Sequence, residues 1–393
     1  MSSDANRIDK RKRRDHRVDA LRGLALLMML TDHVYSDWLN RLTMRNFGFA
    51  DAADIFVLLA GYASYLAYGR LIMRPPPAGG WRVAIHRIVT RCVRLYLFQL
   101  ILLFFYIALT RLWRLRWDVP IDFLEPELSH GFDWFLDVVT LQALPDMVNI
   151  LPIYILFLLS FPLMFWLLRR SPYLLLAGSF ILWALVNLDP AINLPNVIDS
   201  DGWYFDPFAW QFIFAIGVLL AFMVHRLGGN LTISGRLRAL CVAVLIIGVI
   251  ECFPYQLYHL PDLRLFHLRA LADKSSLGPL RIMDVLAIFI LVQSSSWCTR
   301  FASSSPGQIL AVMGRHSLEV FCLGTVLDLI IRLGMATFGT HWPLQLVSNL
   351  VGFLCVYGLA VWLDHHKYEA ALMEGKSRAE ISGGDGASAR RDG

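Results

Sequence analysis

Residues 20–34 read Ala-Leu-Arg-Gly-Leu-Ala-Leu-Leu-Met-Met-Leu-Thr-Asp-His-Val, an apolar run that contains Arg22 and His33. In an α-helix these two side chains lie within about 20° of one face and about 16 Å apart along the axis. Ionisable groups inside a membrane helix are costly in hydrocarbon and usually face a polar cavity. The stretch therefore predicts a membrane helix that presents Arg22 and His33 to such a cavity.

The whole chain shares this apolar character. Its 393 residues are 56% hydrophobic and have a mean hydropathy of +0.53, which is too apolar for a soluble protein. Ten apolar runs each approach the roughly 20 residues that a helix needs to cross a bilayer. The predicted spans are 18–38, 52–69, 92–113, 151–168, 172–189, 208–225, 237–254, 279–297, 316–335 and 342–363. Because these runs are continuous and do not alternate, we predict an all-α polytopic membrane protein with ten transmembrane helices and exclude a barrel.

The distribution of Lys and Arg predicts the orientation in the bilayer. Seven basic residues between positions 7 and 17 indicate a cytoplasmic N-terminus, and ten spans return the C-terminus to the same side. We therefore predict a basic cytoplasmic tail (1–17), a transmembrane domain (18–366) and a cytoplasmic tail (367–393). The last segment is rich in Gly, Ser, Ala and charge, which is typical of disorder.

Several function classes find no support in the sequence. The six cysteines form no CxxC pair and no pair with histidine at metal spacing, so we expect neither a metal site nor a disulfide framework. No phosphate-cradling loop is present, which argues against an ATP-driven pump, and we expect no permanently bound cofactor. The basic N-terminus precedes a membrane helix, so it indicates topology and not a nucleic-acid partner.

His33 is the candidate catalytic base, because histidine exchanges protons near neutral pH. Asp32 and Asp54 are the candidate carboxylates beside it. Asp32 points about 100° away from the ring, whereas Asp54 is expected at a similar depth and is the better candidate to orient it. Arg45 supplies a fixed charge for an acyl carboxylate or an oxyanion. The alternative is that His33 is a satisfied interior histidine and Arg22 a topology charge.

Five stretches resemble known motifs. Arg-Val-Asp-Ala-Leu-Arg-Gly-Leu-Ala (17–25), followed by Asp32 and His33, is similar to the Arg-x10-His signature of the membrane acyltransferase-3 superfamily. The stretch 46–62, which ends in Leu-Leu-Ala-Gly-Tyr, resembles the second-helix motif of that superfamily, with Ala60 where Ser is usual. Arg-Cys-Val-Arg-Leu-Tyr (91–96), Leu-Pro-Ile-Tyr with Phe-Pro (151–162) and Gly-Arg-His-Ser-Leu-Glu-Val-Phe (314–321) also match. The chain most resembles the OpgC family over about 17–364.

This resemblance implies a multi-pass O-acyltransferase of the bacterial inner membrane. Such enzymes move succinyl groups from cytoplasmic succinyl-CoA, a co-substrate, to hydroxyls of an osmoregulated periplasmic glucan. His33 would be the base and Arg22 a contact to the pantetheine arm or thioester of the donor. Arg91 and Arg94 would meet the phosphates of the donor, and Arg315 and His316 would assist donor binding from the cytoplasmic start of the ninth span.

Two other functions remain open at this point. A transporter or flippase of a polar or lipid-linked substrate would share the spans and the interior charges, although no internal repeat is visible. An acetyltransferase that acts on another surface polysaccharide would keep the same site, because nothing in the sequence reports the length of the acyl group.

Overall fold

The computed structural model describes residues 15–34, 37–117, 133–145, 148–229 and 231–388, and these residues form helices and no strand. The α-helices are α2 (His16–His33), α3 (Ala52–Ser64), α4 (Arg70–Ile72), α5 (Trp81–Arg116), α7 (Asp133–Val139), α8 (Ile150–Arg170), α9 (Pro172–Leu188), α10 (Pro207–Arg226), α11 (Gly235–Cys252), α12 (Pro279–Ser294), α13 (Ser296–Ser303), α14 (Ser305–Arg315), α15 (Ser317–Phe338) and α16 (Trp342–Ser388). A π-helical turn, Tyr65–Gly69, joins α3 to α4. The 3-10 turns are Leu39–Leu42, Met44–Asn46, Tyr255–Tyr258 and Leu268–Ala272.

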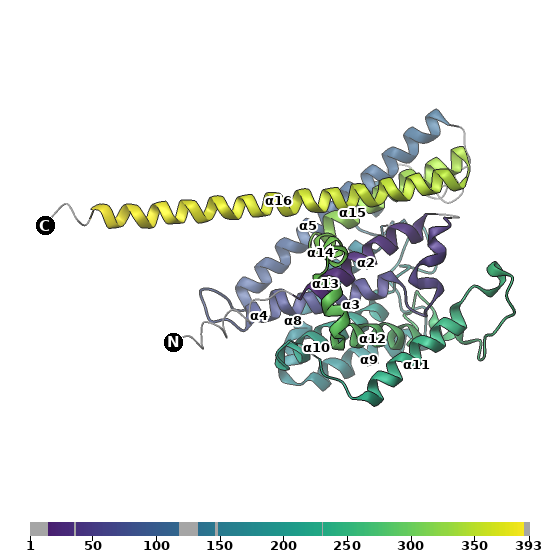
Figure 1. Ribbon diagram of the computed structural model, residues 1–393, viewed down its shortest axis with the longest axis horizontal. Helices are drawn as coiled ribbons and strands as arrows, with labels where there is room; N and C mark the ends of the chain where they lie inside the picture. Colours follow the sequence, from purple (N-terminus) through teal and green to yellow (C-terminus); the bar gives the residue numbers. More distant parts are fainter. Residues whose placement is uncertain (1–14, 35–36, 118–132, 146–147, 230, 389–393) are drawn as a thin grey trace.

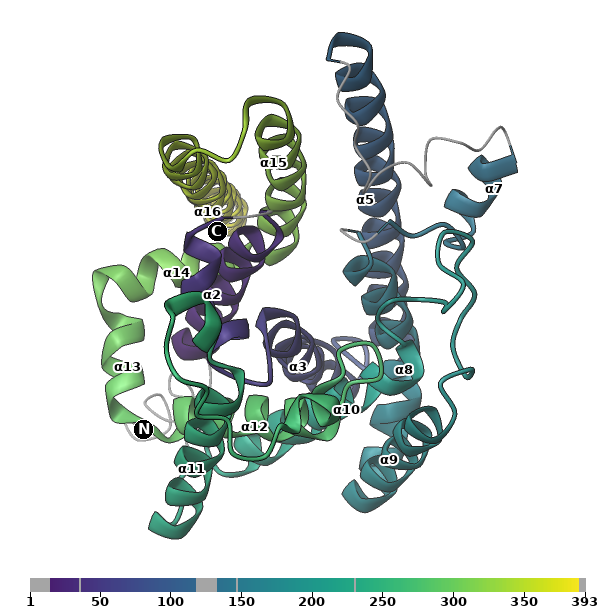
Figure 2. The same cartoon turned by 90° about the vertical axis from the view of Figure 1, so that its right-hand side faces the viewer.

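Helix α2 lies inside the bundle and packs against α3, α14 and α15, whereas α5, α8 and α9 stand together on the far side of α3 (Figure 2). The loop after α11 lies at the end of the molecule where α2 terminates, and α4 lies at the opposite end (Figure 1). We call these the His33 end and the α4 end. The predicted first helix is thus present as one element with Arg22 and His33 on it.

Close backbone contacts fix α2 and α3 in the bundle. A Cβ at Gly23 would overlap the Leu310 carbonyl oxygen of α14, and a Cβ at Gly61 would overlap the Phe214 carbonyl oxygen of α10. Both glycines belong to the first two motifs of the sequence. Their role is to let helices approach at backbone distance, as small residues do in membrane bundles.

We expect Gly61→Ala to destabilise the protein, because the new methyl group meets backbone that has no rotamer to change. Overpacking of this kind costs about 1–3 kcal/mol. The matched control is Gly178→Ala in α9, where nothing lies within 4 Å of the added Cβ, so helix propensity makes it neutral or stabilising. Thermal unfolding of the two purified variants in detergent distinguishes these outcomes; equal melting temperatures would contradict the close contact.

Among the described residues, six helices are long and apolar enough to cross a membrane, or seven if α12 and α13, bent by 76°, form one span. They establish a multi-pass membrane protein. Helices also occupy the other predicted ranges, but α9 has only 17 residues, and α2 and α11 each carry more than two charged residues. Ten spans therefore remain a prediction.

The C-terminal segment differs from the prediction of a disordered tail from residue 367. Helix α16 continues to Ser388 over 47 residues and extends beyond the bundle at the α4 end (Figure 1). Residues 369–380 read Glu-Ala-Ala-Leu-Met-Glu-Gly-Lys-Ser-Arg-Ala-Glu, which are mostly strong helix formers that continue the preceding helix. Residues 1–14 of the basic tail lie outside the described part.

Candidate active site

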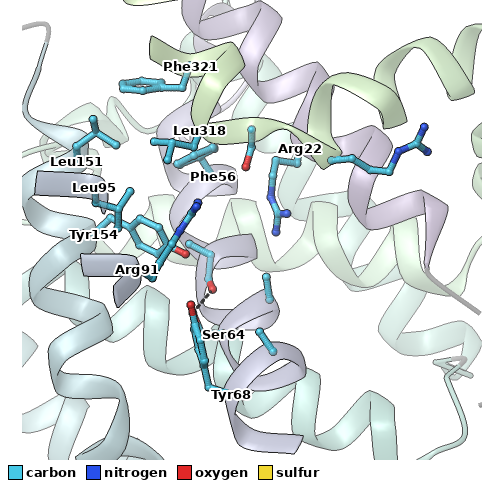
Figure 3. A pocket seen from close by; sticks show the side chains of 15 residues that line it. Arg22, Phe56, Ser64, Tyr68, Arg91, Leu95, Leu151, Tyr154, Leu318 and Phe321 are labelled. Atoms are coloured by element: carbon cyan, nitrogen blue, oxygen red, sulfur yellow. Dashed lines mark hydrogen bonds between the residues drawn. The ribbon is translucent and has the colours of Figure 1, made fainter. Parts of the chain in front are cut away.

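A central cavity of about 330 Å³ lies between α2, α3, α5, α8 and α15. Three arginines that are far apart in the sequence line it: Arg22, Arg91 and Arg315. Figure 3 shows Arg22 and Arg91 reaching into this space from different helices, with Tyr68 and Tyr154 beside Arg91. The cavity thus brings together three of the six residues predicted to bind an acyl donor.

Small side chains make room for the Arg22 guanidinium. Ala60, Ala63 and Ala67 of the α3 segment line the central cavity, and Arg22 NH2 donates to the carbonyl oxygen of Leu59 at 2.9 Å. This contact holds the charge at the cavity wall. Ala60, which departs from the usual serine of the motif, keeps the small volume that the cavity needs.

Arg315 is held by a polar cluster at the α4 end. Its Nε and NH2 donate to the two oxygens of Asp364 at 3.3 and 3.0 Å. The same carboxylate lies 3.2 Å from His316 Nε2, and His316 Nδ1 lies 3.2 Å from Lys367 Nζ. A lysine ammonium only donates, so we assign the His316 proton to Nε2. His316 is buried and does not line the central cavity. Its contacts make it a residue that positions Asp364 and, through it, Arg315.

His33 ends α2 at the opposite end from this cluster, and its partner is Asp328 of α15. His33 Nδ1 lies 3.6 Å from Asp328 Oδ2, and the His33 side chain is 38% exposed while the Asp328 side chain is 1% exposed. Neither Asp328 oxygen accepts a hydrogen bond from the residues that the structure describes. The 3.6 Å separation is longer than a hydrogen bond. Because a buried carboxylate is stabilised by a nearby donor, we infer the tautomer with Nδ1–H toward Asp328, in which Nε2 is the basic nitrogen.

A second and larger hollow, of about 1810 Å³, opens at the α4 end. It is lined by α4, by α13 and by the ends of α2 and α10 on that side. Arg22, Ala63 and Ala67 line both hollows, so the two meet at Arg22. We call the larger one the basic cleft, because five arginines and two histidines line it against two aspartates.

A family model described as OpgC protein matches residues 14–368. The chain belongs to this family. No curated protein and no solved structure matches it. Family membership confirms the resemblance to the OpgC family and, in general terms, assigns the chain to the glucan-modifying acyltransferases.

Other predicted residues of this OpgC chain have structural roles. Asp54 is fully buried and pairs with Arg281 NH2 at 2.6 Å, and it also accepts from the backbone N–H of Asp51 at 2.7 Å. Asp54 is therefore not the carboxylate that the structure places beside His33, contrary to the role expected for it. The reason is that Asp51 and Asp54 form the capping box that begins α3.

Asp51 links this capping box to the loop at the His33 end. Its Oδ2 lies 2.7 Å from Lys274 Nζ and 2.9 Å from Arg281 NH2. Although burial favours the neutral acid, Lys274 and Arg281 hold the pKa of the Asp51 carboxyl below its usual range. The carboxylate therefore stays charged, and its ion pair holds the Lys274 ammonium in place at the His33 end.

Asp32 and Arg45 lie beside each other next to the catalytic candidate. Thr43 Oγ1 donates to Asp32 Oδ1, and Arg45 NH1 lies 3.5 Å from the Asp32 carbonyl oxygen. Asp32 shapes the turn after α2, and Arg45 lies near the end of α2 that carries His33. Arg94, in contrast, is exposed on α5 and lines neither hollow.

The expected polar cavity reaches Arg22, whereas His33 lines neither hollow. Phe56 and Phe321 line the central cavity, and their ring centroids are 6.2 Å apart. Phe321 precedes Asp328 on α15 by seven residues, about 10 Å of helix. The aromatic pair therefore lies between the central cavity and the His33–Asp328 pair along α15.

Proposed function

We propose that this protein is a succinyltransferase of the bacterial inner membrane that uses succinyl-CoA from the cytoplasm and a periplasmic glucan as acceptor. Ten helices cross the bilayer with both termini in the cytoplasm, so the α4 end faces the cytoplasm and the His33 end the periplasm. The excess of Lys and Arg in every second connection supports this orientation.

The observation that carries the proposal is the placement of the two motif residues on α2. Arg22 lies where the central cavity meets the basic cleft, and His33 lies about 16 Å further along the same helix, beside Asp328. An extended pantetheine arm is long and thin enough to cover this distance. In this proposal the arm passes the Phe56–Phe321 pair to reach His33, while the charged head of the donor stays in the basic cleft.

The chemistry at the His33 end is an acyl transfer to an alcohol. A glucan hydroxyl oxygen attacks the thioester carbonyl carbon while His33 Nε2 takes the hydroxyl proton. The negative charge that develops on the carbonyl oxygen is stabilised by cationic groups, for which Arg45 is the candidate. The carbon–sulfur bond then breaks, and the imidazolium returns the proton to the thiolate of CoA.

The test is mass spectrometry of periplasmic glucans from cells with the gene, without it, and with the gene restored. We expect a mass increment that corresponds to succinyl groups and that depends on the gene. An acetyl increment would change the donor and keep the enzyme class. Glucans unaffected by the gene, together with substrate counter-flow in liposomes that lack acyl-CoA, would favour a transporter.

A further inference from the structure

The basic cleft contains positive charge that the fold does not neutralise. Arg17 is engaged by both oxygens of Asp15 and by carbonyl groups of Gln293 and Gly229. Arg70, Arg74 and Arg226 line the same cleft. In the described part of the chain, no carboxylate pairs with these three side chains, and Arg226 stacks on the Phe222 ring at 4.8 Å.

These three arginines converge from two helices that end at the same side of the bundle. Arg70 begins α4 directly after the π-helical turn, and Arg74 follows one helical turn later. Arg226 is the last residue of α10. Several guanidinium groups around one open space form a strong site for phosphate groups, because each offers a planar pair of N–H donors.

The shapes of the two hollows select the kind of ligand. The cleft is more than five times larger than the central cavity, and the rim between them consists of Arg22 and the small residues Ala63 and Ala67. A bulky polyanionic head fits the cleft, and only a narrow chain attached to it can continue past this rim. A nucleotide with several phosphates on a thin arm has this shape.

We propose that the basic cleft binds the phosphate-bearing nucleotide end of the acyl donor through Arg70, Arg74 and Arg226. This inference rests on the proposed function and assigns the donor head to residues that the motifs do not contain. It replaces Arg94 in that role, since Arg94 lies outside the cleft. Arg91 faces the narrow arm in the central cavity instead.

The experiment measures binding of coenzyme A by calorimetry to the full chain in nanodiscs. We expect Arg70→Ala/Arg74→Ala to weaken coenzyme A binding by roughly 10- to 100-fold, because charge-assisted hydrogen bonds to two phosphates are lost. The affinity should also become less sensitive to salt. Pantetheine has the same arm without the nucleotide, so its inhibition of acyl transfer should be the same in this variant and in the wild type.

The matched control is Arg169→Ala/Arg170→Ala. These two arginines end α8 and line neither hollow, so this variant should bind coenzyme A like the wild type. Arg70→Lys/Arg74→Lys keeps the charge and should recover most of the affinity, which separates a binding defect from misfolding. Wild-type affinity in the alanine variant, or an equal loss with pantetheine, overturns the assignment and leaves the proposed function intact. A wild-type protein that does not bind coenzyme A contradicts the proposed function itself.

Discussion

Replacement of His33 by alanine is expected to abolish acyl transfer while the protein stays folded and inserted. The side chain lies at the end of α2 in contact with one buried carboxylate and is partly exposed, so its removal leaves the helix contacts of α2 in place. A positioned general base contributes about 10²–10⁴-fold to a rate. The loss of activity should appear as a lower kcat of the purified protein in nanodiscs. In cells it should appear as glucans that lack the charge of the acyl group.

The control for this variant is His341→Ala. His341 is an exposed histidine between α15 and α16. It lies at the His33 end, because its carbonyl oxygen accepts from the backbone N–H of Gln345, and the Gln345 side chain accepts from the Trp38 backbone N–H. We expect wild-type transfer. Glucans of wild-type charge in the His33→Ala cells would refute the assignment of the base.

Helical periodicity was sufficient to predict that Arg22 and His33 lie on one helix, but not that His33 lies outside the cavity that Arg22 lines. Arg22 and His33 share α2 as their spacing predicts, and the motif arginines Arg91 and Arg315 meet Arg22 in one cavity. Local sequence patterns determine which face of its own helix a motif residue occupies, because motif residues stand at fixed offsets within single helices.

The partners across helices could not be predicted in the same way. Asp328 is one of several carboxylates within the apolar runs of the sequence, and nothing in the sequence indicates that α15 lies beside the end of α2. Depth alone favours Asp54 as the neighbour of His33. Its actual role depends on Arg281, a residue 227 positions away, and on the N–H groups that begin α3. Tertiary packing decides such pairings, and a single sequence does not display it.

Asp328→Asn is expected to lower kcat strongly and to leave donor binding unchanged. The buried Asp328 carboxylate faces His33 Nδ1, so it favours the tautomer with basic Nε2 and stabilises the imidazolium that forms during transfer. An asparagine amide removes the negative charge and offers its own N–H to Nδ1, which favours the wrong tautomer. In hydrolases built on such a carboxylate–histidine pair this change costs up to about 10⁴-fold in kcat.

The measurement is steady-state kinetics of Asp328→Asn with succinyl-CoA, beside a second buried carboxylate as control. Asp284 of α12 is also buried and accepts from the Ala50 backbone N–H, and an asparagine oxygen can still accept that bond. Asp284→Asn should therefore keep a kcat near that of the wild type, while Asp328→Asn loses roughly 10²- to 10⁴-fold with an unchanged KM for the donor. An equal loss in both variants would mean that Asp328 only supports the fold, since a structural carboxylate has no reason to act on kcat alone.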